Sequence, residues 1–331
     1  MDLFTPLLPF PSVRLAGLVV NLNVAGRTPG EEQAHERSAL LRATQREFRL
    51  GDRRARARLS AGRCDQHRLD VQRLGLAQKL ALLWEDYQGN QKRFTYNDLR
   101  VYSNTIAHFL ASLGILPGER VCLFLDRVPE LYIGFLGILK MGAVAQPLFS
   151  AFGDESLCVR LKDAGTSAII TQKKHLHKIR KIREQLPNLR HCIVVDAPQA
   201  SLQEGETAFT MEQVPPVEHF LIYPTKAESP SVLHYTSGTT GQPKGAQHVH
   251  YSIVAQHLTA KWVLDFRPDD IYWCNADPGW VTGTSYGIIG PWANGITQAV
   301  WTPVSTPRNG TSSSRGTALL SGIRRRLPSA C

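Results

Sequence analysis

The sequence predicts an α/β protein in which parallel sheets are covered by helices. Between residues 121 and 235, short apolar runs alternate with stretches of helical period. A strand that is buried on both faces is apolar at every position, so this alternation is typical of a parallel sheet with helices on both sides. The chain has 331 residues, 43% of them apolar, which is enough for a large core. We therefore expect a domain of doubly wound character that begins near Leu76.

The first expected helix opens in the Phe94–Asn97 stretch and continues to Ala111. Thr95 is its expected N-cap, with Asp98 at the third position, because such a pair satisfies free N–H groups at a helix start. The apolar positions recur with helical spacing. The face that they form is expected to contain Leu99, Tyr102, Ile106, His108, Phe109 and Leu110.

The later elements alternate between strand and helix. Residues 197–228 are rich in turn-forming residues and are expected to form a surface excursion. Strands are expected at 121–125, 144–149, 168–171, 192–195 and 231–235, and helices at 129–141, 154–163 and 174–185.

A loop rich in glycine and hydroxyl groups follows the last of these strands. Residues 235–245 read Tyr-Thr-Ser-Gly-Thr-Thr-Gly-Gln-Pro-Lys-Gly. Glycines let the backbone turn tightly and approach a phosphate, and successive N–H groups in such a turn bind an anion. The hydroxyl groups add donors, and Lys244 adds a mobile positive charge. The pattern predicts a loop that binds a polyphosphate.

An ordinary surface loop is the alternative interpretation of this segment. Such a loop does not require a lysine placed between Pro243 and Gly245. The segment also differs from the common P-loop, because it lacks the G-x-x-x-x-G-K-[ST] ending. We therefore favour phosphate binding of a different type.

The string from Thr236 to Gly245, T-S-G-T-T-G-x-P-K-G, resembles the signature loop of the adenylate-forming superfamily. The resemblance implies that the loop holds the β- and γ-phosphates of ATP while an acyl carboxylate attacks the α-phosphate. Lys244 and Thr239 are then the candidates for a catalytic role. The expected nucleotide-binding residues are Thr236, Ser237, Gly238, Thr239, Thr240, Gly241 and Lys244.

A second segment, Ala276–Gly283, reads A-D-P-G-W-V-T-G and is similar to the acetyl-CoA synthetase branch of that superfamily. Residues 248–250 and 261–265 resemble the same branch. A two-carbon acid offers one methyl group for recognition, so its pocket must be small and closed. The resemblance implies an acyl pocket with Trp280, Val281 and Thr282 as substrate-binding residues.

Structural interpretations of the aromatic and histidine residues stay open beside the functional ones. Trp273 and Trp280 can be core aromatics, and for Trp273 we favour that interpretation because large aromatic side chains are mostly structural. His248, His250 and His257 have spacings that a metal site can use, but we favour satisfied structural histidines and expect no metal ligands.

The resemblance covers residues 76–298 and implies a partial AMP-binding domain, the large N-terminal part of such an enzyme, with the C-terminal domain absent. Residues 1–75 hold 13 Arg and no Lys and show no sustained period, so we expect a poorly ordered segment. Residues 299–331 hold 5 Arg and no Lys, Asp or Glu. Their codons, read one nucleotide out of register, permit an amphipathic helix of the kind this family has there. We expect an aberrant basic tail from a shift of reading frame near 299–300.

The net charge of +10 arises from the two ends of the chain, because residues 76–298 hold 20 basic and 20 acidic residues. Nucleic-acid binding would need a basic face on the folded domain, so no nucleic-acid partner is expected. No apolar run approaches the ~18 residues of a membrane span, and the start of the chain lacks the order of a secretory signal. None of the six cysteines forms a C-x-x-C pair. We expect a cytoplasmic protein without a membrane partner.

The resemblance implies an AMP-forming acetate–CoA ligase. Acetate and ATP would give acetyl-AMP and pyrophosphate, and coenzyme A would then give acetyl-CoA and AMP. ATP, Mg²⁺ and coenzyme A are the expected cofactor and co-substrates, and these small molecules with acetate are the expected partners. The lysine that this family needs for adenylation belongs to the absent domain, so full turnover is not expected. A non-catalytic nucleotide-binding remnant or regulator is the alternative.

Overall fold

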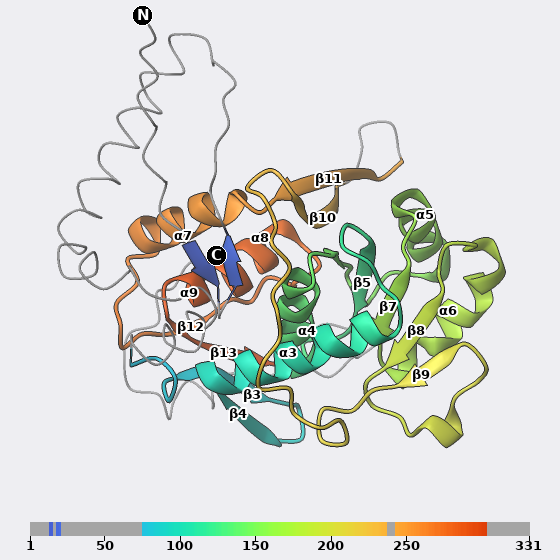
Figure 1. Ribbon diagram of the computed structural model, residues 1–331, viewed down its shortest axis with the longest axis horizontal. Coiled ribbons are helices and arrows are strands. Elements are labelled where there is room, and N and C mark those ends of the chain that lie inside the picture. Colours follow the sequence, from blue (N-terminus) through green and yellow to red (C-terminus); the bar gives the residue numbers. More distant parts are fainter. Residues whose placement is uncertain (1–12, 16–17, 21–74, 237–241, 303–331) are drawn as a thin grey trace, which may run out of the picture.

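The computed structural model of the protein describes residues 13–15, 18–20, 75–236 and 242–302. Within these ranges the chain forms a seven-stranded sheet and a four-stranded sheet, with helices between and outside them (Figure 1). The expected α/β class, with parallel sheets covered by helices, is confirmed.

The seven-stranded sheet has the order β11-β10-β6-β5-β7-β8-β9. All neighbouring strands pair in parallel except β10 and β11. β5 comes first in the chain and lies between β6 and β7, so the winding reverses direction next to β5. Such a reversal leaves a crevice at the carboxyl ends of the strands, where ligands of α/β proteins bind. The strands are β5 Arg120–Phe124, β6 Val144–Pro147, β7 Ala168–Thr171, β8 His191–Val194, β9 Glu206–Ala208, β10 Pro230–Thr236 and β11 Lys244–Val249.

Strand β5 shows why both faces of this sheet carry helices. Val121 and Leu123 belong to the core cluster that contains helix α4, whereas Cys122 and Phe124 belong to the cluster that contains α5 and α6. Successive side chains of a strand point to opposite faces, so one apolar run supplies two cores. The helices are α4 Pro129–Lys140, α5 Asp154–Ala164 and α6 Leu176–Ile182.

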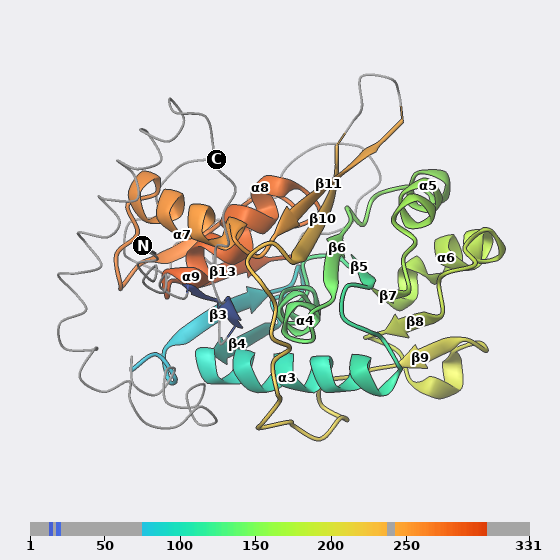
Figure 2. The same cartoon turned by 45° about the horizontal axis from the view of Figure 1, so that its top comes forward.

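The four-stranded sheet has the order β12-β13-β3-β4. One core cluster joins both sheets to α4 and to the long helix α3, which lies next to α4 (Figure 2). Helices α7 and α9 and the short helix α8 lie beside this sheet (Figure 1). The bounds are β3 Leu80–Glu85, β4 Gln91–Thr95, β12 Ile271–Trp273, β13 Thr297–Trp301, α3 Tyr96–Ser112, α7 Ser252–Val263, α8 Val281–Thr284 and α9 Gly290–Ala293.

Helix α4 is the central element of the fold. Every residue of it except Glu130 is buried, which suits a helix that is apolar on all sides. Helix α3 approaches it closely at Gly137, where an added Cβ would lie 2.8 Å from the Ile106 side chain. A glycine at this position therefore sets the distance between the two helices.

The expected start of α3 is confirmed. The Thr95 hydroxyl accepts from the Asp98 N–H at 3.1 Å, and the Asp98 carboxylate accepts from the Thr95 N–H at 2.7 Å. One expected member of its apolar face was wrong, because His108 is exposed. The imidazole lies on the solvent side of a helix whose other face buries Leu99 and Leu110.

The helix expected at 174–185 is divided into three parts. Helix α6 is flanked by 3₁₀ turns at Lys173–His175 and Arg183–Gln185. The turns are closed by bonds from His175 N–H to Gln172 O and from Leu186 N–H to Arg183 O. Such turns are common at helix ends.

The proposed domain limits stay predictions, but two elements bear on them. Residues 13–15 and 18–20 form a short antiparallel pair, β1 and β2, within the segment expected to lack order. Strand β13 crosses the limit at residue 298 and pairs with β3 as far as Trp301. Most of 1–75 and of 299–331 lies outside the described residues. None of the described helices has the length and apolar character that a membrane span requires.

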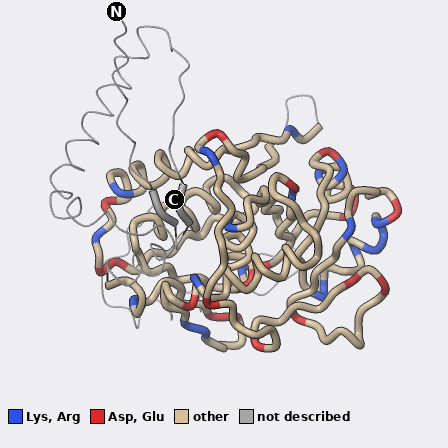
Figure 3. The backbone as a smooth tube through the Cα atoms, in the orientation of Figure 1, with Lys and Arg blue, Asp and Glu red and all other residues tan. Residues whose placement is uncertain are grey.

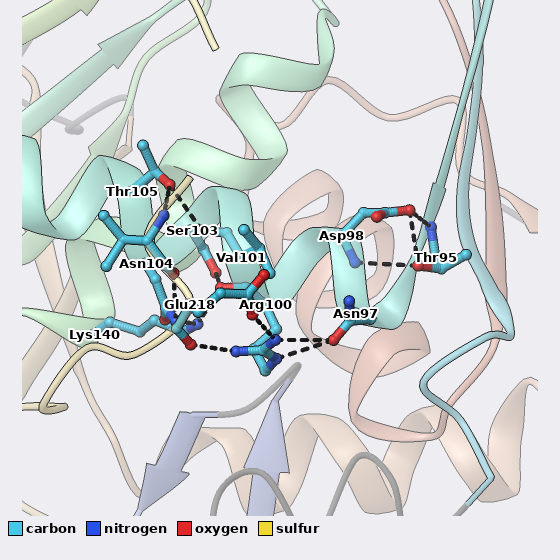
Figure 4. A network of polar contacts seen from close by, with 11 residues as sticks. Thr95, Asn97, Asp98, Arg100, Val101, Ser103, Asn104, Thr105, Lys140 and Glu218 are labelled. Atoms are coloured by element: carbon cyan, nitrogen blue, oxygen red, sulfur yellow. Dashed lines mark hydrogen bonds and ion pairs between the residues drawn. The ribbon is translucent and has the colours of Figure 1, made fainter. Parts of the chain in front are cut away.

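A polar network holds the segment 217–223, here called the strap, across α3 and α4 (Figure 4). The Lys140 ammonium donates to Asn104 Oδ1 at 2.7 Å and to Arg100 O at 3.1 Å. The Asn104 amide donates in turn to the Val217 carbonyl at 3.2 Å, and the Arg100 guanidinium pairs with the Glu218 carboxylate at 2.7 Å. The buried lysine therefore holds the Asn104 side chain and the Arg100 main chain, and these two α3 residues bind the strap.

Burial, with the nearby Arg100 charge, lowers the pKa of Lys140 from 10.5 to about 7. The unfolded chain then binds more protons than the folded chain between these two pH values, so this group makes stability rise with pH across that window. We expect Lys140→Met to remove this part of the rise. The measurement is the free energy of unfolding of both proteins in urea from about pH 6 to 10.

Lys162→Met provides the control. Because Lys162 is exposed, its replacement should not alter the pH dependence of the free energy of unfolding. A difference between wild type and Lys140→Met that stays constant across the window would contradict the lowered pKa.

Candidate active site

The predicted phosphate loop connects β10 to β11. Thr236 and Lys244 are cross-strand partners at the loop end of this antiparallel pair, and the Thr236 hydroxyl donates to Lys244 O at 3.4 Å. Both residues are exposed. The other predicted binding residues, Ser237, Gly238, Thr239, Thr240 and Gly241, lie outside the described residues, so their roles stay predictions.

The hairpin is fixed to the sheet by alternating side chains. Leu233 and Tyr235 are buried in the cluster with α5, and Val232 pairs with Ala145 of β6. The Tyr235 hydroxyl donates to the Asp163 carboxylate at the end of α5 at 2.6 Å. Burial, followed by the Asp163 carboxylate, raises the pKa of Tyr235. Tyr235, at the base of the loop, is thus held by its hydrogen bond to α5, and its strand β10 is held by pairing with β6.

A pocket lies on the α5 side of this hairpin, with a cavity volume of about 640 Å³. Its lining includes Lys244 and Pro243 from the loop end and Tyr235 from β10, and Arg120 supplies a second cation. The Arg120 guanidinium already donates to Ala164 O at 2.6 Å, so it caps α5. Lys244 is therefore the cation of this pocket that can turn toward a phosphate.

The opposite face of the hairpin carries histidines. The His234 and His248 rings lie 5.7 Å apart, and burial, with the His248 charge, lowers the pKa of His234 to about 4. Burial also lowers the pKa of His250 to about 4, so both are neutral at pH 7. Within the described residues no group of three or more His, Cys, Asp or Glu side chains is arranged to hold a metal ion. The expectation that these histidines are satisfied was wrong for His250, since neither of its ring nitrogens has a hydrogen-bond partner among the described residues. The expected absence of metal ligands stays a prediction.

The predicted acyl segment crosses from one sheet to the other. It leaves the carboxyl end of β12 and meets the chain just after β6, where Gly279 leaves no room for a side chain. A Cβ there would overlap the Phe149 backbone nitrogen and lie 2.8 Å from Leu148 C. A Cβ at Gly283 would overlap the Asp277 carbonyl oxygen. Both glycines are therefore required by close backbone packing.

The three predicted pocket residues lie at the start of α8. Trp280 is its N-cap, and its side chain is 51% exposed, with its ring 6.4 Å from that of Phe149. The interpretation of Trp280 as a core aromatic was therefore wrong, whereas Trp273 is half-buried on β12. Val281 and Thr282 are also exposed, so all three side chains can contact a ligand. Their role in binding the acid stays a prediction.

The two predicted sites come together at one edge of the seven-stranded sheet. The loop follows β10, and the acyl segment packs against the chain that follows β6. β10 and β6 are parallel neighbours, so their carboxyl ends lie side by side. Two segments that are about 40 residues apart in the sequence thus reach the same edge.

Polar residues after β5 escaped the sequence analysis. Asp126 pairs with Lys174, and its Oδ1 lies 3.2 Å from His175 Nε2, both from the segment that follows β7. Burial alone would raise the pKa of Asp126, but the hydrogen bonds from His175 and Lys174 hold it well below its usual value. Arg127 contacts the acyl segment through Asp277, 3.7 Å from its carboxylate. An Asp-Arg pair directly after a buried strand was the signal that could have identified them.

Comparison with known proteins gives a consistent result. The family model described as AMP-binding enzyme matches residues 71–313. Acetyl-coenzyme A synthetase of Bacillus subtilis (strain 168) is 39% identical over 234 residues, which cover 67% of this chain and 38% of that protein. The protein of the same name from Pyrobaculum arsenaticum is 35% identical over 247 residues, covering 67% of this chain and 37% of that one.

A solved structure agrees with these relatives. The crystal structure of the Brucella canis acyl-CoA synthetase matches with a TM-score of 0.66 and 26% sequence identity, covering 78% of this chain and 44% of that one. The chain spans less than two fifths of the length of the curated relatives it matches. The resemblance that the two motifs indicated is confirmed.

We expect Tyr235→Phe to lower the free energy of unfolding by about 1 kcal/mol, because it removes one hydrogen bond at the base of the loop. Urea unfolding measures this change. Tyr87→Phe is the matched control, since Tyr87 is exposed and its hydroxyl contacts only the exposed neighbour Gln88 among the hydrogen bonds of the described residues. Equal effects of the two changes would contradict the role of Asp163.

We expect Gly279→Ala to destabilise the fold by about 1–3 kcal/mol, because an added methyl group would force the Leu148–Phe149 backbone away. Gly153→Ala is the control, since a Cβ at Gly153 meets nothing within 4 Å and the change at this N-cap of α5 should cost less than about 1 kcal/mol. Chemical denaturation compares them. A neutral Gly279→Ala would show that the segment does not pack against the Leu148–Phe149 backbone.

Proposed function

The chain belongs to the AMP-binding enzyme family, and from this membership we propose that it binds ATP at the β10–β11 hairpin and joins it to a short carboxylic acid as an acyl adenylate. Adenylate-forming acyl-CoA synthetases activate an acid with ATP. Acetate is the proposed acid, because the Ala276–Gly283 string is that of the acetyl-CoA synthetase branch and the relatives described above carry that name.

One observation carries this proposal. The phosphate-loop hairpin and the acyl segment lie at the carboxyl ends of neighbouring parallel strands, β10 and β6. Adenylation requires the carboxylate of the acid to reach the α-phosphorus of ATP, so the two binding segments must share one edge. Two surface loops with unrelated roles would not be required to lie at the ends of neighbouring strands.

The chemistry assigned to the hairpin is charge neutralisation. A carboxylate oxygen of the acid attacks the α-phosphorus, the bond from that phosphorus to the bridging oxygen breaks, and pyrophosphate leaves with the bonding electrons. The Lys244 ammonium and the hairpin N–H groups would compensate the charge that moves onto pyrophosphate. Thr239 remains the second candidate for a catalytic role. Preformed donors of this kind act through position rather than through proton transfer.

In the proposed second step the coenzyme A thiolate attacks the acyl carbonyl, the bond to the AMP oxygen breaks, and AMP leaves. No described residue is assigned to this step. Among the described residues no cluster of carboxylates or histidines fits a resident metal ion. Mg²⁺ commonly binds through the phosphates of the nucleotide. Its participation stays a prediction, as do the absence of a nucleic-acid partner and the location in the cytoplasm.

The acyl pocket would be formed by the start of α8. Trp280, Val281 and Thr282 have exposed side chains there, and the Trp280 ring lies 6.4 Å from that of Phe149, which follows β6. An indole and an isopropyl group suit the methyl group of acetate, since a small apolar surface distinguishes short acids by about 1–3 kcal/mol per methylene.

A second candidate function is nucleotide binding without turnover. It is supported by the hairpin itself, where the Lys244 cation lines a cavity beside the predicted phosphate loop. A hairpin that holds ATP without bringing it to the acid would bind ATP and leave it intact.

We expect the purified chain to bind ATP and Lys244→Ala to weaken that binding at least tenfold, because the ammonium group is the mobile cation of the hairpin. Calorimetry measures binding, and acetate-dependent exchange of pyrophosphate into ATP measures adenylation. Lys226→Ala is the matched control, since Lys226 is an exposed lysine that precedes the opposite end of β10.

Exchange that disappears in Lys244→Ala supports adenylation. Binding without exchange supports the second candidate. A folded wild-type chain that binds no ATP would contradict both.

A further inference from the structure

Arg127 occupies a position from which it contacts both sheets. It follows β5 and precedes Pro129, the first residue of α4. Its carbonyl oxygen accepts from the Trp84 indole N–H at 2.8 Å and from the Thr302 hydroxyl at 2.6 Å. Trp84 belongs to β3, and Thr302 follows β13. The Arg127 main chain therefore ties the carboxyl edge of the seven-stranded sheet to that of the four-stranded sheet.

The Arg127 side chain extends from this junction to the acyl segment. Its Nη2 donates to the Asn275 carbonyl at 2.6 Å, and its Nε lies 3.7 Å from Asp277 Oδ2. The side chains are 19% and 15% exposed, so both charges are largely shielded from water. Removal of either partner would leave the other charge partly buried and without its counterion.

Asp277 transmits this contact to the start of α8. Its Oδ1 accepts from the Gly279 N–H at 2.8 Å, and its carbonyl oxygen accepts from the Trp280 N–H at 2.9 Å. The Thr284 hydroxyl donates to the Pro278 carbonyl at 2.7 Å. One oxygen of the Asp277 carboxylate thus faces Arg127, and the other accepts a hydrogen bond from the turn that orients Trp280.

The surroundings restrict this turn to one position. Gly279 is in backbone contact with Leu148 and Phe149, and Gly283 is in contact with the Asp277 carbonyl. A turn packed this closely cannot move alone, so a shift of the Asp277 carboxylate moves the N-cap of α8 as well. Displacement of a substrate-positioning group by about 1 Å can cost on the order of 100-fold in rate.

We propose that Arg127 is a positioning residue for the acyl pocket: acting through Asp277, it sets the place of Trp280, Val281 and Thr282 relative to the phosphate-loop hairpin. The inference rests on the proposed function for the identity of the ligand. It assigns to Arg127 a role in recognition of the acyl group and not of the nucleotide, because its side-chain contacts named above are to Asp277 of the acyl segment and to Asn275, the residue before that segment.

Two variants of the full chain test the proposal. Arg127→Met removes the charge and keeps an unbranched apolar side chain. Asp277→Asn removes the counter-charge in nearly the same volume and keeps an acceptor for the Gly279 N–H, so it should fold where Arg127→Met does not. Arg190→Met is the control, since Arg190 forms an ion pair with Glu119 at 2.8 Å far along the sheet from the acyl segment.

The first readout is amide hydrogen exchange, which needs no ligand. We expect the Gly279 and Trp280 amides to exchange at least tenfold faster in Arg127→Met and Asp277→Asn than in wild type, because the turn loses its anchor. The Arg190 control should leave them unchanged. Unchanged protection in Asp277→Asn would overturn the proposal.

The second readout separates the acyl group from the nucleotide. Two stable mimics, 5′-O-sulfamoyladenosine and its N-acetyl derivative, differ only in the acyl group, so the ratio of their Kd values measures acyl recognition. We expect this ratio to fall about tenfold in both variants, with the Kd for 5′-O-sulfamoyladenosine unchanged within twofold. Arg127→Lys should restore part of the ratio, because lysine keeps the charge and loses the fork of donors.

The outcomes separate the two proposals. Faster exchange with an unchanged ratio would make Arg127 purely structural and overturn the inference. A wild-type chain that binds 5′-O-sulfamoyladenosine but gains nothing from the acetyl group would overturn the acyl pocket while leaving ATP binding intact. A folded wild-type chain that binds neither mimic would overturn the proposed function, and the inference with it.

Discussion

The burial of helix α4 between two sheets is the constraint on which the rest of the structure depends. A parallel sheet needs cover on both faces, and α4 supplies it for the seven-stranded sheet while sharing a core cluster with β3 and β13. Because α4 is shared by the two sheets, the turn between β5 and α4 decides how the carboxyl edges of the two sheets lie relative to each other. Arg127 stands at that turn and bonds to Trp84 and Thr302.

The candidate site follows from this arrangement. Parallel strands end at one edge, so the segments after β5, β6, β7 and β10 meet there. The phosphate-loop hairpin contributes Lys244, the acyl segment contributes Trp280, and Asp126 with His175 occupies the point where the winding reverses beside β5. The apolar interior stabilises the fold, and the polar groups of the candidate site lie at the carboxyl edge of the sheet, where the chain emerges from the core.

Charge has a different role in each part of the structure. Lys140 is almost fully buried and serves as a donor that holds Asn104 and the strap. Arg127 and Asp277 are partly buried and bring two sheets and a turn into one position. Lys244 is exposed at the end of the hairpin, where its charge is accessible to the phosphate ligand that we propose. The burial of each cation thus agrees with the contact that it makes or, for Lys244, with the role that we propose.

Local patterns were sufficient to predict the fold class, the order of strands and helices from 121 to 195 and the capping box at Thr95, because each depends on neighbouring residues and on the period of apolar side chains. They missed β9, which lies within the segment 197–228 that was expected to be a surface excursion. The two motifs were also readable, since a loop's donors lie within ten residues. Only the tertiary structure decided that Trp280 is exposed, that Gly279 packs on Leu148, and that Arg127 reaches Asp277 across 150 residues of chain. Contacts between distant segments depend on how strands are ordered in a sheet, and a one-dimensional period carries no information about that order.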